Sequence, residues 1–128
     1  MKSVRTGILG DSNRFNLRPI KREAIRKDAL NLLIRNEDIV GAFKTVRDQV
    51  IFTNRRIIVV NVQGLGKKIS YFSYPYSKIL YFGIETAGIM DIDSEMSISF
   101  ANGAVLRFDF TIRTDVRAVC NAISEYIL

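Results

Sequence analysis

The feature that most constrains the fold is a series of short segments rich in β-branched and aromatic residues, joined by connections of only a few residues. We expect seven strands, at residues 39–46, 49–53, 56–62, 68–74, 77–86, 95–100 and 104–111. Parallel neighbours need long crossover connections, and most of these turns are too short to provide them. The strands are therefore predicted to form an antiparallel sheet.

The last two of these segments carry the clearest pattern. Apolar and polar residues alternate through 95–100 and again through 104–111, so each strand should turn one face toward the core. Asn102-Gly103 stands between them and predicts a two-residue hairpin with a type I′ turn.

Two amphipathic helices are expected to flank the strands. Residues 18–36 place apolar side chains at helical spacing and basic ones on the other face, and Pro19 suits a first helical turn. Such a helix should lie on an apolar surface of its own domain or of a neighbour. A second helix is expected after Thr114 or Asp115, either of which supplies an N-cap oxygen.

The order of elements predicts a mainly β, α+β domain. A chain of 128 residues suits one domain, which we divide into a basic, flexible leader (1–17), the amphipathic helix (18–36), and a barrel with its C-terminal helix (37–128). An antiparallel barrel or sandwich closed by the C-terminal helix is expected, because closure removes free strand edges.

Composition excludes several classes of function. The chain has no histidine, which excludes a histidine base and a Ser–His pair, and its single cysteine excludes an intrachain disulfide. No apolar stretch is long enough for a membrane-spanning helix or a secretory signal, so we expect a soluble, cytoplasmic protein.

The net charge of +6 is concentrated at the N-terminus, where residues 1–28 carry eight basic and three acidic side chains. Three interpretations stay open: a solvated helix face, attraction to anionic lipid or nucleic acid, or pairing with acids of another subunit. The residues that would hold an anionic surface are Arg14, Arg18, Lys21, Arg22, Arg26 and Lys27.

Several local strings resemble the bacterial pleckstrin-homology (PH) domain family, in particular its short stand-alone prokaryotic members. They are Arg47 to Arg56, Tyr74 to Ile79, Glu85 to Gly88 and Asp91 to Glu95, and the resemblance covers about residues 30–128. It implies a seven-stranded, strongly bent barrel with a helix plugging one end. It also implies assembly into symmetric rings, with no established biochemical role.

Eukaryotic proteins with this fold often bind phosphoinositides through a long basic loop between the first two strands. The corresponding connection here is Val46-Arg47-Asp48, which is short and has one acid beside its one base. No phosphoinositide motif is present, and fold analogy alone does not justify predicting one.

Asp91, Asp93 and Glu95 form a D-x-D-x-E string that could ligate Ca²⁺ or Mg²⁺, lie in a solvated loop, or pair with arginines of a neighbouring subunit. The string lacks the glycine and the later glutamate of a calcium loop. Arg55 and Arg56 are the arginines we expect as donors. The hypothetical oligomer interface therefore comprises Arg55, Arg56, Glu85, Asp91, Asp93 and Glu95.

The remaining candidate motifs point to structure. Cys120 lies on the apolar stripe of the last helix and is expected to be a buried, inert thiol. Residues 64–68 fit neither a Walker pattern nor a dinucleotide fingerprint. Most of the aromatic rings between residues 71 and 82 are expected in the core, and those that the strand alternation leaves outside are typical of interfaces.

We therefore expect no catalytic residue, no cofactor and no metal. The leading hypothesis is a non-enzymatic module that assembles with itself as a cyclic homo-oligomer and can contact other proteins. The alternative is a module that binds an anionic surface, either membrane lipid or nucleic acid, through its basic N-terminal segment.

Overall fold

The computed structural model describes residues 14–65, 68–87, 93–110 and 114–128. Eight strands form one sheet in the order β5-β4-β3-β2-β1-β8-β7-β6. The strands are β1 (Arg14–Pro19), β2 (Ile39–Lys44), β3 (Gln49–Thr53), β4 (Arg56–Gln63), β5 (Lys68–Pro75), β6 (Ile79–Glu85), β7 (Ser94–Phe100) and β8 (Val105–Phe110). The helices are η1 (Arg22–Ala24), α1 (Lys27–Leu30), η2 (Tyr76–Lys78) and α2 (Val116–Ile127).

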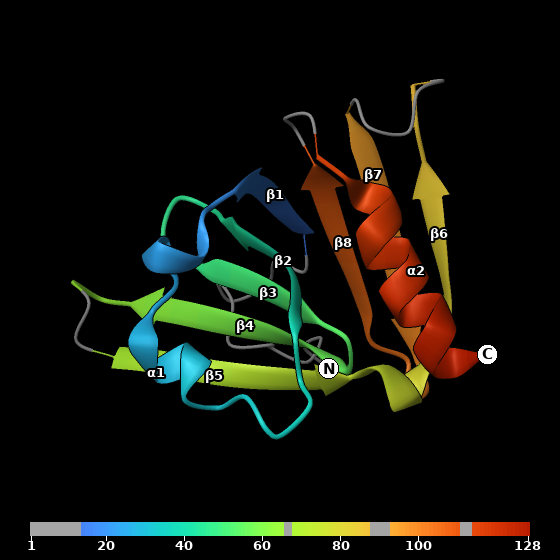
Figure 1. Cartoon of the computed structure of the whole chain (residues 1–128). Coiled ribbons are helices and arrows are strands. Elements are labelled where there is room, and N and C mark those ends of the chain that lie inside the picture. The colour runs from blue at the N-terminus through green and yellow to red at the C-terminus, as the bar shows by residue number, and fades with distance from the viewer. Residues whose placement is uncertain (1–13, 66–67, 88–92, 111–113) are drawn as a thin grey trace.

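The sheet curls into a half-barrel whose two halves meet at β1 (Figure 1). β1 pairs antiparallel with β2 through Arg18 and Pro19, and it runs parallel to β8 from Arg14 to Leu17. The seven strands expected from residue 39 onward are present, and β1 is an eighth. One pair of strands is therefore parallel, which the long stretch of chain between β1 and β8 permits. Residues 14–17 belong to the sheet, so the prediction of a flexible leader is wrong for them, and residues 1–13 lie outside the described part.

The inner face of the half-barrel holds the larger core. Four phenylalanine rings pack at its centre, with ring centroids between 5.2 and 6.3 Å apart for the pairs in contact. These rings are Phe43, Phe52, Phe108 and Phe110. α2 lies over this face beside β2 and η2 and buries Val116, Val119 and Ile123 against the rings. The alternation predicted for β7 and β8 is confirmed, because every second residue of both strands is buried.

A second, smaller core covers the outer face of β2 to β5. Ile25 and Ala29 are buried there against Ala42, Ile51 and Ile58. As a result β3 is buried on both faces from Val50 to Thr53.

The continuous helix predicted over residues 18–36 is not formed. Pro19 is the last residue of β1, and Ile20 still donates its N–H to Ala42 in β2 at 2.9 Å. Ile25 and Arg26 then adopt extended backbone, with ψ of 138° and 134°, which separates η1 from α1. The segment does lie on an apolar surface of its own domain, as expected, but as two single turns. Contacts with the sheet outweigh the helical propensity of this segment.

The hairpin between β7 and β8 is confirmed, but its turn is not type I′. Gly103 has a φ of +92°, whereas Asn102 keeps a negative φ, and a type I′ turn needs both to be positive. Gly103 donates its N–H to the carbonyl of Phe100 at 2.9 Å, and Phe100 donates to Ala104 at 2.9 Å. The connection is therefore a three-residue loop with glycine in the left-handed position.

The two ends of the sheet, β5 and β6, are joined by η2 but do not pair with each other. Closure into a barrel without free edges, which we expected, is therefore not complete. β6 carries Leu80 and Tyr81, with 65% and 64% of their surface exposed. Leu80 lies where the pairing of β6 with β7 shifts register.

Candidate interaction site at the β3–β4 turn

The two arginines expected at an interface lie in the turn between β3 and β4. The hydroxyl oxygen of Thr53 accepts the backbone N–H groups of both Arg55 and Arg56 at 3.0 Å. A threonine at the start of such a turn fixes the backbone of the next residues. The two neighbouring guanidinium groups nevertheless have very different surroundings.

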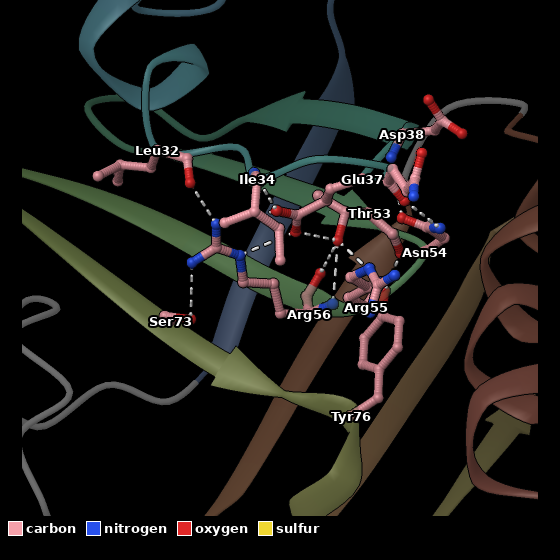
Figure 2. A network of polar contacts seen from close by, with 11 residues as sticks. Leu32, Ile34, Glu37, Asp38, Thr53, Asn54, Arg55, Arg56, Ser73 and Tyr76 are labelled. Atoms are coloured by element: carbon pink, nitrogen blue, oxygen red, sulfur yellow. Dashed lines mark hydrogen bonds and ion pairs between the residues drawn. The ribbon is translucent and has the colours of Figure 1, made fainter.

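Arg56 forms a buried ion pair with Glu37 (Figure 2). Its Nε and Nη2 donate to the two carboxylate oxygens at 2.8 and 3.0 Å, which is the bidentate geometry that arginine favours. The Thr53 hydroxyl donates to the same carboxylate at 2.7 Å, and the N–H of Ile34 donates at 3.0 Å. The Glu37 side chain has no exposed surface.

These contacts set the pKa of Glu37. Burial alone would raise the pKa, but hydrogen bonds from Arg56, Thr53 and Ile34, together with the charge of Arg56, bring it below its ordinary value. Arg56 also donates to the carbonyl of Leu32 at 2.6 Å and to the Ser73 hydroxyl at 3.2 Å. Arg56 is thus bound within its own chain, and Glu37 is the partner that sequence reasoning missed.

Tyr76 connects this turn to the start of β6. The side chain is fully buried, and its hydroxyl donates to the carbonyl of Thr53 at 2.6 Å. Burial, with a smaller contribution from the charge of Glu37, raises the pKa of Tyr76, so the hydroxyl remains a donor. Its ring contacts that of Tyr126 on α2, with centroids 6.1 Å apart. The turn, η2 and α2 are therefore held together.

Arg55 points into a different environment. It lines a cavity of about 600 Å³ between the β3–β4 turn and α2, together with Asp38 from the approach to β2 and Glu125 from α2. Its Nε is buried and has no hydrogen-bond partner among the described residues. Of the two arginines expected at an interface, Arg55 is the one with a guanidinium nitrogen still to be satisfied.

The acidic residues of the predicted interface lie at the far end of the sheet. Glu85 in β6 stands directly opposite Glu95 in β7, which stands opposite Asp109 in β8. We call these three residues the acidic row. Asp93 precedes β7 with a φ of +44°, and Asp91 lies outside the described residues.

Arg14 neutralises part of the acidic row. Its Nη1 forms ion pairs with Asp109 at 2.8 Å and with Glu95. These contacts lower the pKa of Glu95, and those with Asp109 and Glu95 raise the pKa of Arg14. Arg14 therefore pairs with acids of its own sheet, and its binding to an anionic surface stays a prediction. Asp109 was missed because only the pairing of β7 with β8 brings it beside Glu95.

The other basic residues predicted to bind anions are all exposed. They are Arg18, Lys21, Arg22, Arg26 and Lys27. Arg18 lies in β1, and the other four lie in or directly before the two short turns that follow it, so the five residues do not share one helix face. Arg18 stands directly opposite Lys44 of β2, a basic residue that sequence reasoning did not include.

Cys120 is half-buried on α2 and packs against the inner core, and burial raises the pKa of its thiol. Among the described residues, no group of three Cys, Asp or Glu side chains is arranged to hold a metal ion. Within the same residues, none of the helices has the length and apolar character needed to cross a membrane.

An eight-stranded curled sheet with a helix over its inner face defines a PH-like domain. The sequence profile described as the bacterial PH domain matches residues 8–127. The chain belongs to the bacterial PH domain family, as its local sequence strings predicted.

Known proteins agree with this assignment. Two similar sequences are the uncharacterized proteins YjqA and YozO of Bacillus subtilis strain 168. YjqA is 40% identical over 101 residues, covering 78% of this chain and 76% of that protein. YozO is 28% identical over 108 residues, covering 84% of this chain and 94% of that protein.

Two solved structures share the fold. One is a DUF1696 family protein with a pleckstrin-homology domain from Shewanella loihica PV-4, at 31% identity and a TM-score of 0.71, covering 89% of this chain and 99% of that one. The other is a pleckstrin homology domain from Shewanella amazonensis SB2B, at 37% identity and a TM-score of 0.56, covering 79% and 83%.

Proposed function

We propose that this protein is a non-enzymatic assembly module that forms a cyclic homo-oligomer. The observation that carries the proposal is that, among the described residues, no strand pairs with the outer edge of β5 or of β6. A free edge presents unpaired N–H and C=O groups that a second chain can pair with. Both edges are long, at eight and seven residues.

The two edges differ from each other, which favours head-to-tail contact over a symmetric pair. An interface between unlike surfaces closes into a ring when the rotation between copies permits it. β6 brings the exposed side chains of Leu80 and Tyr81 and ends at Glu85 of the acidic row. β5 begins at the exposed Lys68. Unlike charges thus lie on the two edges.

The test is the absolute mass in solution, measured by light scattering behind a sizing column. We expect a discrete multiple of 14.6 kDa for the parent chain, and a lower mass for Tyr81→Glu, because a charge on an edge strand opposes pairing. Val46→Glu is the matched control, since Val46 is fully exposed in the β2–β3 turn and belongs to neither edge strand. A parent that is monomeric at low and high salt contradicts the proposal.

A second candidate function is binding to an anionic surface, either lipid or nucleic acid. Arg18 and Lys44 stand opposite each other on neighbouring strands, and like charges in that position repel. A bound anion would relieve the repulsion. Lys21, Arg22, Arg26 and Lys27, which follow β1, are also basic and exposed.

The experiment is sedimentation with phosphatidylserine vesicles and a mobility shift with duplex DNA. We expect binding that weakens steeply as salt rises and that Arg18→Gln reduces several-fold. Lys78→Gln, which removes an exposed charge from η2 between β5 and β6, serves as control. Binding that does not depend on salt, or an equal effect of both variants, contradicts this function.

A further inference from the structure

The cavity between the β3–β4 turn and α2 carries an inference that does not depend on the proposed assembly. The cavity measures about 600 Å³. Small side chains of α2, Ala118 and Ala122, lie four residues apart and leave room along the helix. Val40 and Tyr126 also line the cavity, and its polar lining consists of Asp38, Asn54, Arg55, Asn121 and Glu125.

One guanidinium nitrogen of Arg55, its Nε, has no hydrogen-bond partner among the residues that the structure describes. This nitrogen is buried. Leaving a charged donor buried and unsatisfied is costly, and native structures seldom do so without a reason. The adjacent Arg56, whose Nε donates to Glu37 at 2.8 Å, shows how completely the same fold satisfies a guanidinium group when its role is structural.

The polar side chains beside Arg55 differ in whether they already form hydrogen bonds within the chain. The side chain of Asn54 is used, because its oxygen accepts the N–H of Asp38 at 2.9 Å and its nitrogen donates to Asn36 at 3.2 Å. Asn54 thereby holds the wall of the cavity in place, and its side-chain oxygen is already used as an acceptor by the N–H of Asp38. Asn121, on the exposed side of α2, adds an amide to the same cavity.

We propose that this cavity is a binding site for a carboxylate group, with Arg55 as its principal donor. A carboxylate is planar and matches the fork of N–H groups that arginine presents. The acidic side chains of Asp38 and Glu125 line the same cavity, so a doubly charged phosphate is repelled more strongly than a singly charged carboxylate. They also favour a carboxylate that carries N–H groups beside it, as an acidic residue in a peptide does.

The test observes the Arg55 Nε–H group directly by ¹H–¹⁵N NMR of the full chain. Sodium acetate is the probe, and sodium chloride at equal ionic strength is the reference. We expect a saturable shift of the Arg55 Nε–H resonance with acetate alone. The Nε–H of Arg56, already bound to Glu37, is the internal control and should not move.

Two variants separate binding from folding. Arg55→Lys keeps the charge but loses the fork, and we expect acetate to bind about tenfold more weakly. Arg22→Lys, an exposed arginine elsewhere in the chain, should leave acetate binding unchanged. The proposal is overturned if chloride shifts the Arg55 resonance as acetate does, if the shift does not saturate, or if both variants behave like the parent.

A second arm identifies where the carboxylate comes from. A fluorescent pentapeptide Gly-Ala-Asp-Ala-Gly, compared with its Asn analogue by anisotropy, tests a separate acidic peptide. Dilution of the parent chain alone tests a second copy, because the Arg55 resonance then moves with protein concentration and the assembled mass falls. Either result supports the carboxylate site, and the dilution series also shows whether assembly fails while acetate binding persists.

Discussion

Glu37 is a buried carboxylate that depends on hydrogen bonds and a positive charge from its neighbours. It sits with no exposed surface between Arg56, which is 19% exposed, and the Thr53 hydroxyl. Removing one partner of a buried pair leaves the other charge uncompensated. We expect Glu37→Gln to lower the free energy of unfolding by about 3 kcal/mol near neutral pH, measured by urea denaturation with circular dichroism.

The same pair gives a pH dependence with a defined sign. The pKa of Glu37 is below its ordinary value of 4.5 in the folded chain, so the unfolded chain takes up the proton first as pH falls. The stabilisation is therefore complete above the unfolded pKa and is lost as pH drops through the folded pKa. The stability difference between the parent and Glu37→Gln should be constant well above pH 4.5 and shrink below it. A difference that persists unchanged into acid contradicts this explanation.

Asp48 is a second buried acid, with only 1% of its surface exposed. One carboxylate oxygen accepts from the N–H of Val62 at 3.0 Å and from Asn61 at 3.3 Å, while the other is buried with no partner among the described residues. Asp48→Ala leaves two donors unsatisfied and should lower the free energy of unfolding by about 2 kcal/mol. Asp48→Asn keeps the accepting oxygen and should change it by less than about 1 kcal/mol. Equal losses in the two variants would mean that the second oxygen is also bound.

At the scale of elements, the strands were predictable because their signal is local. The alternation through residues 95–100 reappears as alternating burial in β7, and Gly103 marks the hairpin. The signal for 18–36 was misleading for a physical reason. Ile25 and Ala29 have the spacing of a helix face, but they cover the outer side of the sheet from two separate turns. β1 was missed because its partners in β2 and β8 lie far along the chain.

The covering role of this segment can be measured. Ile25 is 4% exposed in the outer core, whereas Ile34 is 58% exposed at the end of the same segment. Ile25→Ala should lower the free energy of unfolding by about 2 to 3 kcal/mol, since it empties a packed site. Ile34→Ala deletes the same side-chain atoms at a solvent-exposed position and should change the free energy of unfolding by less than about 0.5 kcal/mol. Equal effects in urea denaturation would show that the segment does not pack as described.

At the scale of the whole molecule, the candidate site too could be predicted only in part from the sequence. The sequence singled out Arg55 and Arg56 as a pair, and the structure gives them opposite roles. Arg56 forms an ion pair with Glu37, which is 19 residues away in the sequence. Arg55 lines a cavity whose other wall is α2, near the C-terminal end of the sequence. Residue type and spacing indicated two arginines in a turn. Which of them stays available depends on contacts between distant segments, which spacing does not encode.

The unlike edges of the sheet lead to a prediction about the assembly as a whole. Tyr81→Glu places a charge on the β6 edge, and Ser73→Glu places one on the exposed side of β5. If β5 of one copy pairs with β6 of the next, each variant alone loses both of its contacts with identical copies and should be monomeric. Mixing the two variants leaves one intact β5 edge facing one intact β6 edge. The mixture should therefore form dimers of twice 14.6 kDa and no larger species.

An interface of β6 with β6 makes a different prediction in the same experiment. Ser73→Glu alone would then remain dimeric, because its β6 edge is unchanged, and mixing would create nothing new. Light scattering of each variant, of the equimolar mixture, and of a mixture with Val46→Glu as control separates the two arrangements. Monomers in every sample that contains only edge variants, including the equimolar mixture, would contradict pairing between β5 and β6. Only a head-to-tail contact joins two defective copies into one dimer, because each supplies the edge that the other has lost.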